Sequence, residues 1–169
     1  MTVERERLQN RLHEAAVVLC AWLVLTSPWV SMLRRVPSGA GFFDRAHVVL
    51  GFAGLLVGLA YGYACARGGR WRLYFPWLAG NVRPAVRDLA GLLRGRLPSA
   101  EGGGLFAVIE GLLLLALLVV GITGAAWFLL QGSADALACR SAHVVAARVL
   151  VGLIVAHVLA VASHLLELA

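Results

Sequence analysis

The chain has 169 residues, 60% of them hydrophobic, and its mean hydropathy is +0.82. A soluble domain of this length has too little interior to bury so much apolar surface, so the composition excludes an ordinary water-soluble fold. The formal net charge of +6 rests on fifteen arginines and no lysine. These arginines flank apolar runs, a placement that indicates membrane topology and argues against nucleic-acid binding.

Four apolar runs follow one another along the chain, and each is about as long as the 20 residues that a spanning helix needs. They are Ala15–Leu33, Ala46–Ala66, Leu105–Leu130 and Ala142–Leu166. Because backbone polar groups must be satisfied within lipid, helices are the suitable structure for these runs. The sequence therefore predicts one all-α domain over residues 1–169, an integral membrane four-helix bundle in contact with membrane lipid.

The ends of these runs predict the topology. No A-x-A-like cleavage site follows the first run, so we interpret it as an uncleaved span that Pro28 kinks or ends near its outer side. The connection Arg67–Gly104 holds seven arginines, and the N-terminus holds three more. The positive-inside rule then places both termini and this connection in the cytoplasm (N-in/C-in), as expected for a multi-pass protein of the bacterial cytoplasmic (inner) membrane.

The connection between the second and third runs is too long for a plain turn. Its aromatic stretch Trp71–Trp77 is typical of the headgroup level of a membrane. Apolar residues recur at helical spacing over Pro84–Leu97, opposite Arg87 and Arg94. This pattern predicts an interfacial amphipathic helix on the inner leaflet, with a solvated charged loop as the alternative.

Four histidines lie at or near the ends of three predicted spans: His13, His47, His143 and His157. The last two are fourteen residues apart, so they share one helix face and lie about 21 Å apart along its axis. With spans alternating in direction, depth pairs His47 with His143 near the outer surface and His13 with His157 near the inner one. Imidazole is a common axial ligand of haem iron, so these pairs predict two stacked haem b sites. The spacing is too large for one tetrahedral zinc site.

Further residues lie near these histidines. Gly51, Gly54 and Gly58 follow His47 on its own helix face, where small residues leave room for a porphyrin or let two helices pack closely. Arg148 comes five residues after His143, inside the fourth span. We expect it to be buried and paired with an anion such as a haem propionate, or with a backbone carbonyl.

Two ionisable residues could form a quinone or proton site near the inner surface. His164 follows His157 by seven residues on the same face. It could bind a propionate or a quinone carbonyl, replace His157 as the partner of His13, or lie at the headgroup level. Glu110, early in the third span, either moves protons for quinone chemistry or extends to the interface. No other residue is expected to be catalytic.

Three segments resemble the bacterial cytochrome b561 family: RLQNRLHEA (Arg7–Ala15), FDRAHVVLG (Phe43–Gly51) and the pattern H-x13-H-x6-H that begins at His143. The family lies within a wider group of di-haem b-type membrane subunits of formate dehydrogenase, Ni-Fe hydrogenase and thiosulfate reductase. The resemblance covers nearly the whole chain and is weakest in the third span. The chain departs from the family at Glu14, where Trp is common, and at Leu165, where a second histidine is common.

The resemblance implies a four-helix bundle with two b haems that transfers electrons across the membrane, between the quinone pool and a redox protein or catalytic subunit of a respiratory chain. Two alternatives stay open. One is a stand-alone superoxide:quinone oxidoreductase, which would make the chain an enzyme by itself. The other is a haem-bearing membrane anchor subunit of a respiratory oxidoreductase complex.

Overall fold

The computed structural model describes residues 2–69, 71–96 and 104–167, without the side chains of Thr2 and of residues 163–167. Its elements are the α-helices α1 (Thr2–Thr26), α2 (Phe42–Arg67), α3 (Trp71–Tyr74), α4 (Arg83–Leu92), α5 (Leu105–Leu129) and α6 (Ala136–Glu167), and a 3-10 turn η1 (Ser27–Trp29). Over the described ranges there is no strand, and four helices are long and apolar enough to cross a membrane. The predicted all-α membrane bundle is thus confirmed.

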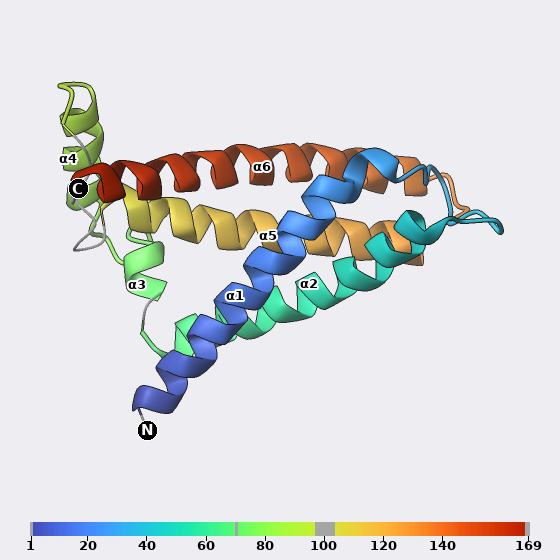
Figure 1. The fold of residues 1–169 in the computed structure, drawn as a ribbon, viewed down its shortest axis with the longest axis horizontal. Helices are drawn as coiled ribbons and strands as arrows, with labels where there is room; N and C mark the ends of the chain where they lie inside the picture. The colour runs from blue at the N-terminus through green and yellow to red at the C-terminus, as the bar shows by residue number, and fades with distance from the viewer. Residues whose placement is uncertain (1, 70, 97–103, 168–169) are drawn as a thin grey trace.

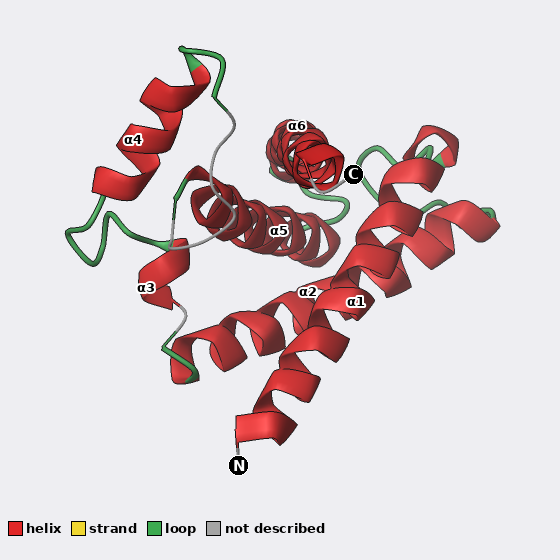
Figure 2. Ribbon diagram, turned by 60° about the vertical axis from the view of Figure 1, so that its left-hand side comes forward, coloured by secondary structure: helices red, strands yellow, loops and turns green. Residues whose placement is uncertain are grey.

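The four long helices pack in chain order. Helix α1 packs on α2, α2 on α5, and α5 on α6, while α3 and α4 pack on α5 (Figures 1 and 2). Within the described part of the chain, α1 and α6 have few or no close backbone contacts, so a space remains between them. We refer to the end of the bundle that carries α3 and α4 as the inner end, and to the opposite end as the outer end. The start of α1 and the end of α6 also lie at the inner end (Figure 1).

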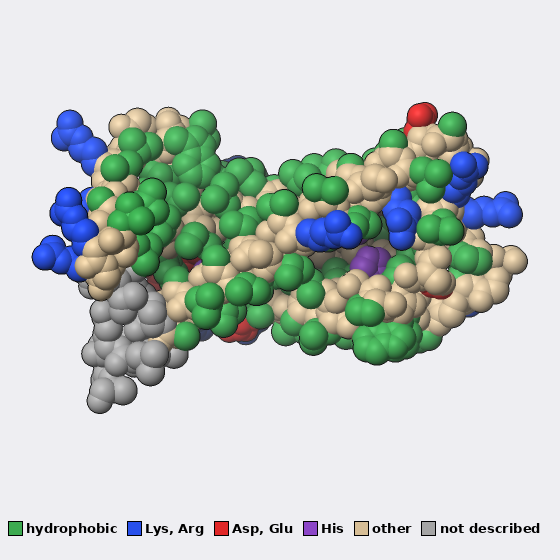
Figure 3. All heavy atoms as spheres, turned by 90° about the horizontal axis from the view of Figure 1, so that it is seen from above, with side chains coloured by type: hydrophobic (Ala, Val, Ile, Leu, Met, Phe, Trp, Pro, Cys, Tyr) green, Lys and Arg blue, Asp and Glu red, His purple; other side chains and the backbone are tan. Residues whose placement is uncertain are grey.

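Apolar side chains cover the outside of the bundle. Val18 on α1, Leu56 on α2 and Leu129 on α5 are each at least two thirds exposed. Figure 3 shows this hydrophobic surface along one side of the molecule, with arginines concentrated toward its two ends. So large an exposed apolar area suits the hydrocarbon of a bilayer, where helices satisfy their own backbone groups.

The segment after α1 is fixed to the outer ends of α5 and α6. Trp127 Nε1 donates a hydrogen bond to the Leu33 carbonyl at 2.8 Å, and Arg140 Nε donates one to the Met32 carbonyl at 2.9 Å. Met32 and Trp127 are buried together in a small apolar core. These bonds close the outer end, although α1 itself stays apart from α6.

Two of the long helices do not begin and end where the apolar runs do. Helix α1 begins at Thr2, before the expected first span at Ala15, and it ends at Thr26, before the expected end at Leu33. It ends early because Pro28, the second residue of η1, has no N–H to continue the helix. At the other boundary, α6 begins at Ala136, so the outer connection that was expected to run to Ser141 is shorter.

The amphipathic helix is confirmed as α4, but it is shorter than predicted. Gly95 has a φ of +73°, a conformation that commonly follows the end of a helix. The predicted end of this helix, Leu97, lies outside the described residues.

Candidate functional site

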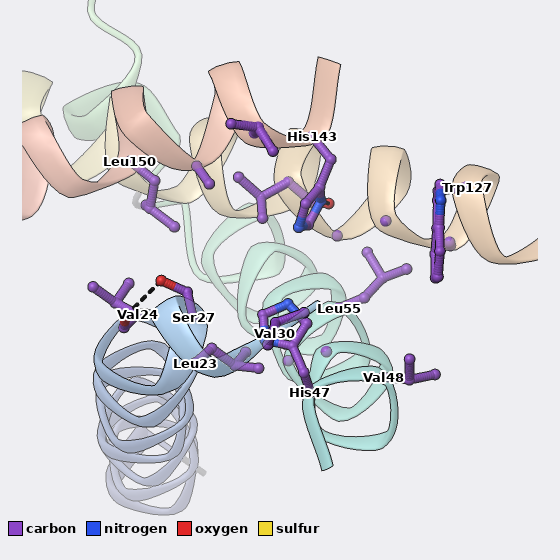
Figure 4. A pocket seen from close by; sticks show the side chains of 18 of the residues that line it. Leu23, Val24, Ser27, Val30, His47, Val48, Leu55, Trp127, His143 and Leu150 are labelled. Atoms are coloured by element: carbon purple, nitrogen blue, oxygen red, sulfur yellow. Dashed lines mark hydrogen bonds between the residues drawn. The ribbon is translucent and has the colours of Figure 1, made fainter. Parts of the chain in front are cut away.

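A cavity of about 510 Å³ lies between α1, α2, α5 and α6 in the outer half of the bundle. Its walls are mainly apolar, with Leu23 from α1, Leu55 from α2 and Leu150 from α6 among the residues that line it (Figure 4). Figure 3 shows the hollow from its open side, with a histidine at its bottom and cationic side chains at its margin. The space left between α1 and α6 is therefore a cavity whose volume and mainly apolar lining are typical of a cofactor site.

His47 and His143 face each other across this cavity (Figure 4). Their ring centres are 6.3 Å apart and their planes are nearly perpendicular, at 85°. Two imidazole nitrogens that share one metal ion each lie about 2 Å from it. Because each nitrogen is roughly 1 Å from its ring centre, such a pair has ring centres about 6 Å apart. The separation of His47 and His143 thus fits one metal ion held between them.

The ring of His143 is held in place by α5. Its Nδ1 lies 3.0 Å from the Val120 carbonyl, which can only accept, so Nδ1 carries the proton and Nε2 is left free. The Thr123 hydroxyl is a weaker neighbour at 3.5 Å. Gly124 provides the room, since a Cβ added there would lie 3.1 Å from His143 Cε1. A metal-binding histidine is commonly oriented in this way through its second nitrogen.

His47 lacks such a partner. Its Nδ1 is buried, and no group among the described residues forms a hydrogen bond with it. An unmade hydrogen bond in an apolar interior costs roughly 1–3 kcal/mol. A half-buried imidazole whose Nδ1 is buried without a partner, an opposing imidazole and apolar walls match the surroundings that a b haem would need rather than those of a hydrated ion. In the described ranges no group of three or more His, Cys, Asp or Glu side chains could hold a metal ion.

The three glycines after His47 have different surroundings. Gly51 and Gly54 line the cavity, and a Cβ at Gly51 would meet nothing within 4 Å. At Gly58 an added Cβ would lie 3.2 Å from Leu117 Cδ2 on α5. Gly58 therefore belongs to the contact between α2 and α5, which at this position favours the second of the two alternatives, close packing of helices.

Arg148 lines the cavity, but it is exposed, which corrects the expectation that it is buried. It is exposed because the cavity opens sideways between α1 and α6. Arg140 also lines the cavity, and its Nε is already bonded to the Met32 carbonyl. One lateral opening thus carries two cations, a suitable place for the acidic groups of a bound cofactor.

The two histidines of the inner pair have different surroundings from each other. His13 is exposed on α1, and its ring centre lies 5.9 Å from that of Tyr61. His157 on α6 lies 5.2 Å from the Phe106 ring, and its Nδ1 is buried without a hydrogen-bond partner among the described residues. His13 and His157 are close enough to interact electrostatically. The structure thus brings the two residues to the same level without ring contact between them.

A polar cluster lies beside this inner pair. Tyr61 and Tyr74 are joined by a side-chain hydrogen bond, and Glu110 and Cys65 interact electrostatically with Tyr61. Glu110 is therefore one member of a group of polar residues and not an isolated carboxylate. His164 belongs to α6, but its side chain lies outside the described residues.

Sequence reasoning missed the groups on α5 that hold His143. The signal available was Gly121 and Gly124 within an otherwise bulky apolar run, because small residues in a span mark places of close approach. Asp44 was also missed. It is buried three residues before His47 and accepts hydrogen bonds from the backbone N–H and the hydroxyl of Ser31, which fix the start of α2.

The chain was compared with known proteins. A family model, described as prokaryotic cytochrome b561, matches residues 5–168. Neither the search of curated proteins nor the search of solved structures gives a match. The family match covers nearly the whole chain, including all four spanning helices and every candidate histidine. The chain therefore belongs to the prokaryotic cytochrome b561 family of membrane haem b electron-transfer proteins.

Proposed function

We propose that residues 1–169 form a single di-haem domain that transfers electrons across the membrane between the quinone pool and a redox protein or catalytic subunit. His47 and His143 would hold the outer haem, and His13 and His157 the inner one. When bound, a b haem supplies a one-electron carrier whose potential the protein tunes. The observation that carries this proposal is the 6.3 Å separation of the His47 and His143 rings across an apolar cavity.

The residues around the outer pair have separate roles in this proposal. The Val120 carbonyl holds the proton of His143 on Nδ1, so that Nε2 would be free to bind the iron. Gly51 and Gly54 keep the wall of α2 flat, and the apolar lining excludes water. Arg148 and Arg140 would bind the propionates at the lateral opening, which accounts for two cations in a span that is otherwise apolar.

At the inner end, quinone chemistry requires protons as well as electrons. Glu110 and Tyr61 lie together there, and Tyr61 contacts the ring of His13. This neighbourhood supports a quinone site at the inner end, with Glu110 as the group that transfers the proton. The seven arginines of the connection Arg67–Gly104 support a location in the cytoplasmic membrane with the inner end toward the cytoplasm.

Ligand substitutions test the outer site. If His47 and His143 bind one iron, His47→Ala and His143→Ala should each remove the same haem and leave identical reduced-minus-oxidised spectra. Val145→Ala is the matched control, because Val145 lies two residues from His143 and is exposed on the outside of α6. Two variants that lose different haems, or a Val145→Ala spectrum like that of His143→Ala, would overturn the assignment.

A further inference from the structure

Helix α4 is docked on the bundle through one buried carboxylate. Asp88 is 7% exposed, and its Oδ2 accepts a hydrogen bond from the Leu105 N–H at 3.0 Å. That N–H is among the first of α5, where the backbone donors have no partner within the helix and favour a negative charge. Asp88 therefore caps α5 and holds α4 against its start. Both views show α4 lying across the direction of α5 and α6 (Figures 1 and 2).

An apolar stripe runs along a second face of this helix. Its members are spaced by three or four residues, so they lie within about 60° of one another around the helix. They are Val82, Val86, Leu89 and Leu93, and all four are exposed, Leu93 to 85%. Leu73, Trp77 and Leu78, in the segment before α4, are exposed as well. The inner end thus presents a continuous set of unburied apolar side chains next to the spanning helices.

Three exposed arginines lie on α4 or directly after it. Arg83 and Arg87 lie about 110° around the helix from the apolar stripe, and Arg94 follows in the turn after the helix ends at Leu92. Within the described part of the chain, no ion pair neutralises them. Because these side chains are exposed, their charge faces the surroundings of the described chain.

We propose that α4 binds anionic phospholipids at the membrane surface. Because α4 lies across the spanning helices, its apolar stripe can enter the acyl region beside the bundle while its arginines reach the headgroups. An apolar face with adjacent arginines is the pattern of helices bound to anionic membrane surfaces. Asp88 fixes the orientation, so lipid binding at α4 bears directly on the first turn of α5. This inference does not depend on the haem assignment.

The contact between α4 and anionic lipids can be measured by the quenching of a fluorescent label at the end of α4 by brominated lipids. The full chain with Leu93→Cys, Cys20→Ala, Cys65→Ala and Cys139→Ala would carry a bimane label at position 93. The protein would be reconstituted in phosphatidylcholine bilayers with a fixed small fraction of brominated phosphatidylglycerol or of brominated phosphatidylcholine. We expect quenching by the brominated phosphatidylglycerol to be roughly fivefold stronger, the contribution of one arginine near an anionic surface, and to weaken in high salt.

Two triple variants separate α4 from general charge effects. The Arg83→Gln, Arg87→Gln and Arg94→Gln variant should quench equally with both lipids. The control Arg34→Gln, Arg35→Gln and Arg45→Gln loses the same charge at exposed positions of the outer end, and it should keep the preference. Equal quenching in the parent protein, or a preference that survives the α4 substitutions, would overturn the proposal. Weak quenching by both lipids would overturn it as well, because α4 would then be covered by protein.

Discussion

The two ends of the bundle differ in how the same four helices surround their histidines. At the outer end, hydrogen bonds from Trp127 and Arg140 tie the segment after α1 to α5 and α6, and His47 and His143 face each other across a cavity. At the inner end, His13 is exposed and His157 contacts Phe106, while Tyr61, Tyr74 and Glu110 form a polar cluster. The outer end thus holds its two histidines in a defined geometry, and the inner end places ionisable groups beside its histidines. This difference suits a protein that moves electrons at one end and electrons with protons at the other.

The largest expected effect is the loss of haem when His143 or His157 is replaced. Each is proposed to bind a different iron, so His143→Ala and His157→Ala should each lose one of two haems, and the double variant both. Pyridine haemochrome assays on purified protein give the count. His164→Ala is the control and should keep both haems. If His157→Ala kept both and His164→Ala lost one, the inner assignment would be wrong.

A smaller effect tests how firmly α5 holds the outer histidine. In Gly124→Ala the new Cβ would lie 3.1 Å from His143 Cε1, so the ring must move against its hydrogen bond to Val120. We expect outer-haem affinity to fall about 10-fold or more, as for other groups that orient a metal ligand. Haem titration of apoprotein measures it.

Gly58→Ala is the matched control for this substitution. Its Cβ would lie 3.2 Å from Leu117 Cδ2, a similar clearance, but against the end of a flexible leucine side chain instead of a histidine ring. It should leave haem affinity unchanged. Equal losses in the two variants would show that general packing, rather than the His143 ring, is responsible.

At the inner end, Glu110→Gln tests the proton-transfer role. It should slow oxidation of the reduced haems by a soluble quinone about 10-fold or more, the lower range for a general acid–base group, without loss of haem. Stopped-flow spectroscopy measures the rate. An unchanged rate in a fully haem-loaded variant would remove Glu110 from the quinone site.

The smallest effect concerns stability at the inner end. Asp88→Ala removes the cap of α5 and should lower the free energy of unfolding by about 1 kcal/mol, while both haems remain. Unfolding in sodium dodecyl sulfate measures this change, with Glu6→Ala at an exposed position within α1 as the control. A loss of haem in Asp88→Ala would mean that α4 supports the cofactor sites directly.

Much of the fold could be predicted because lipid imposes strong constraints on sequence. Long apolar runs become helices, and the fourteen-residue spacing of His143 and His157 determines their depth and shared face. Pro28 marked the end of the first span for a local reason, its missing N–H. The pairing of His47 with His143 followed from depth alone, because both lie near helix ends that must meet the same surface.

The remaining features depend on where the helices cross and how each is rotated about its own axis. Gly58 and Gly51 share a face of α2, yet only Gly51 lines the cavity, because α5 crosses α2 at Gly58. Arg148 is exposed because α1 and α6 stay apart, which no pattern within either helix indicates. The contacts of His143 with Val120 and Gly124 likewise depend on the rotation of α5 relative to α6.

The measurement that tests the central claim most directly is the haem content of the purified chain. Pyridine haemochrome absorbance, set against protein concentration from amino-acid analysis, should give two b haems per chain, because four histidines pair at two depths. A value of one would leave only the outer site, with the inner histidines serving the polar cluster. A value of zero in protein purified with its native lipids would contradict the whole account.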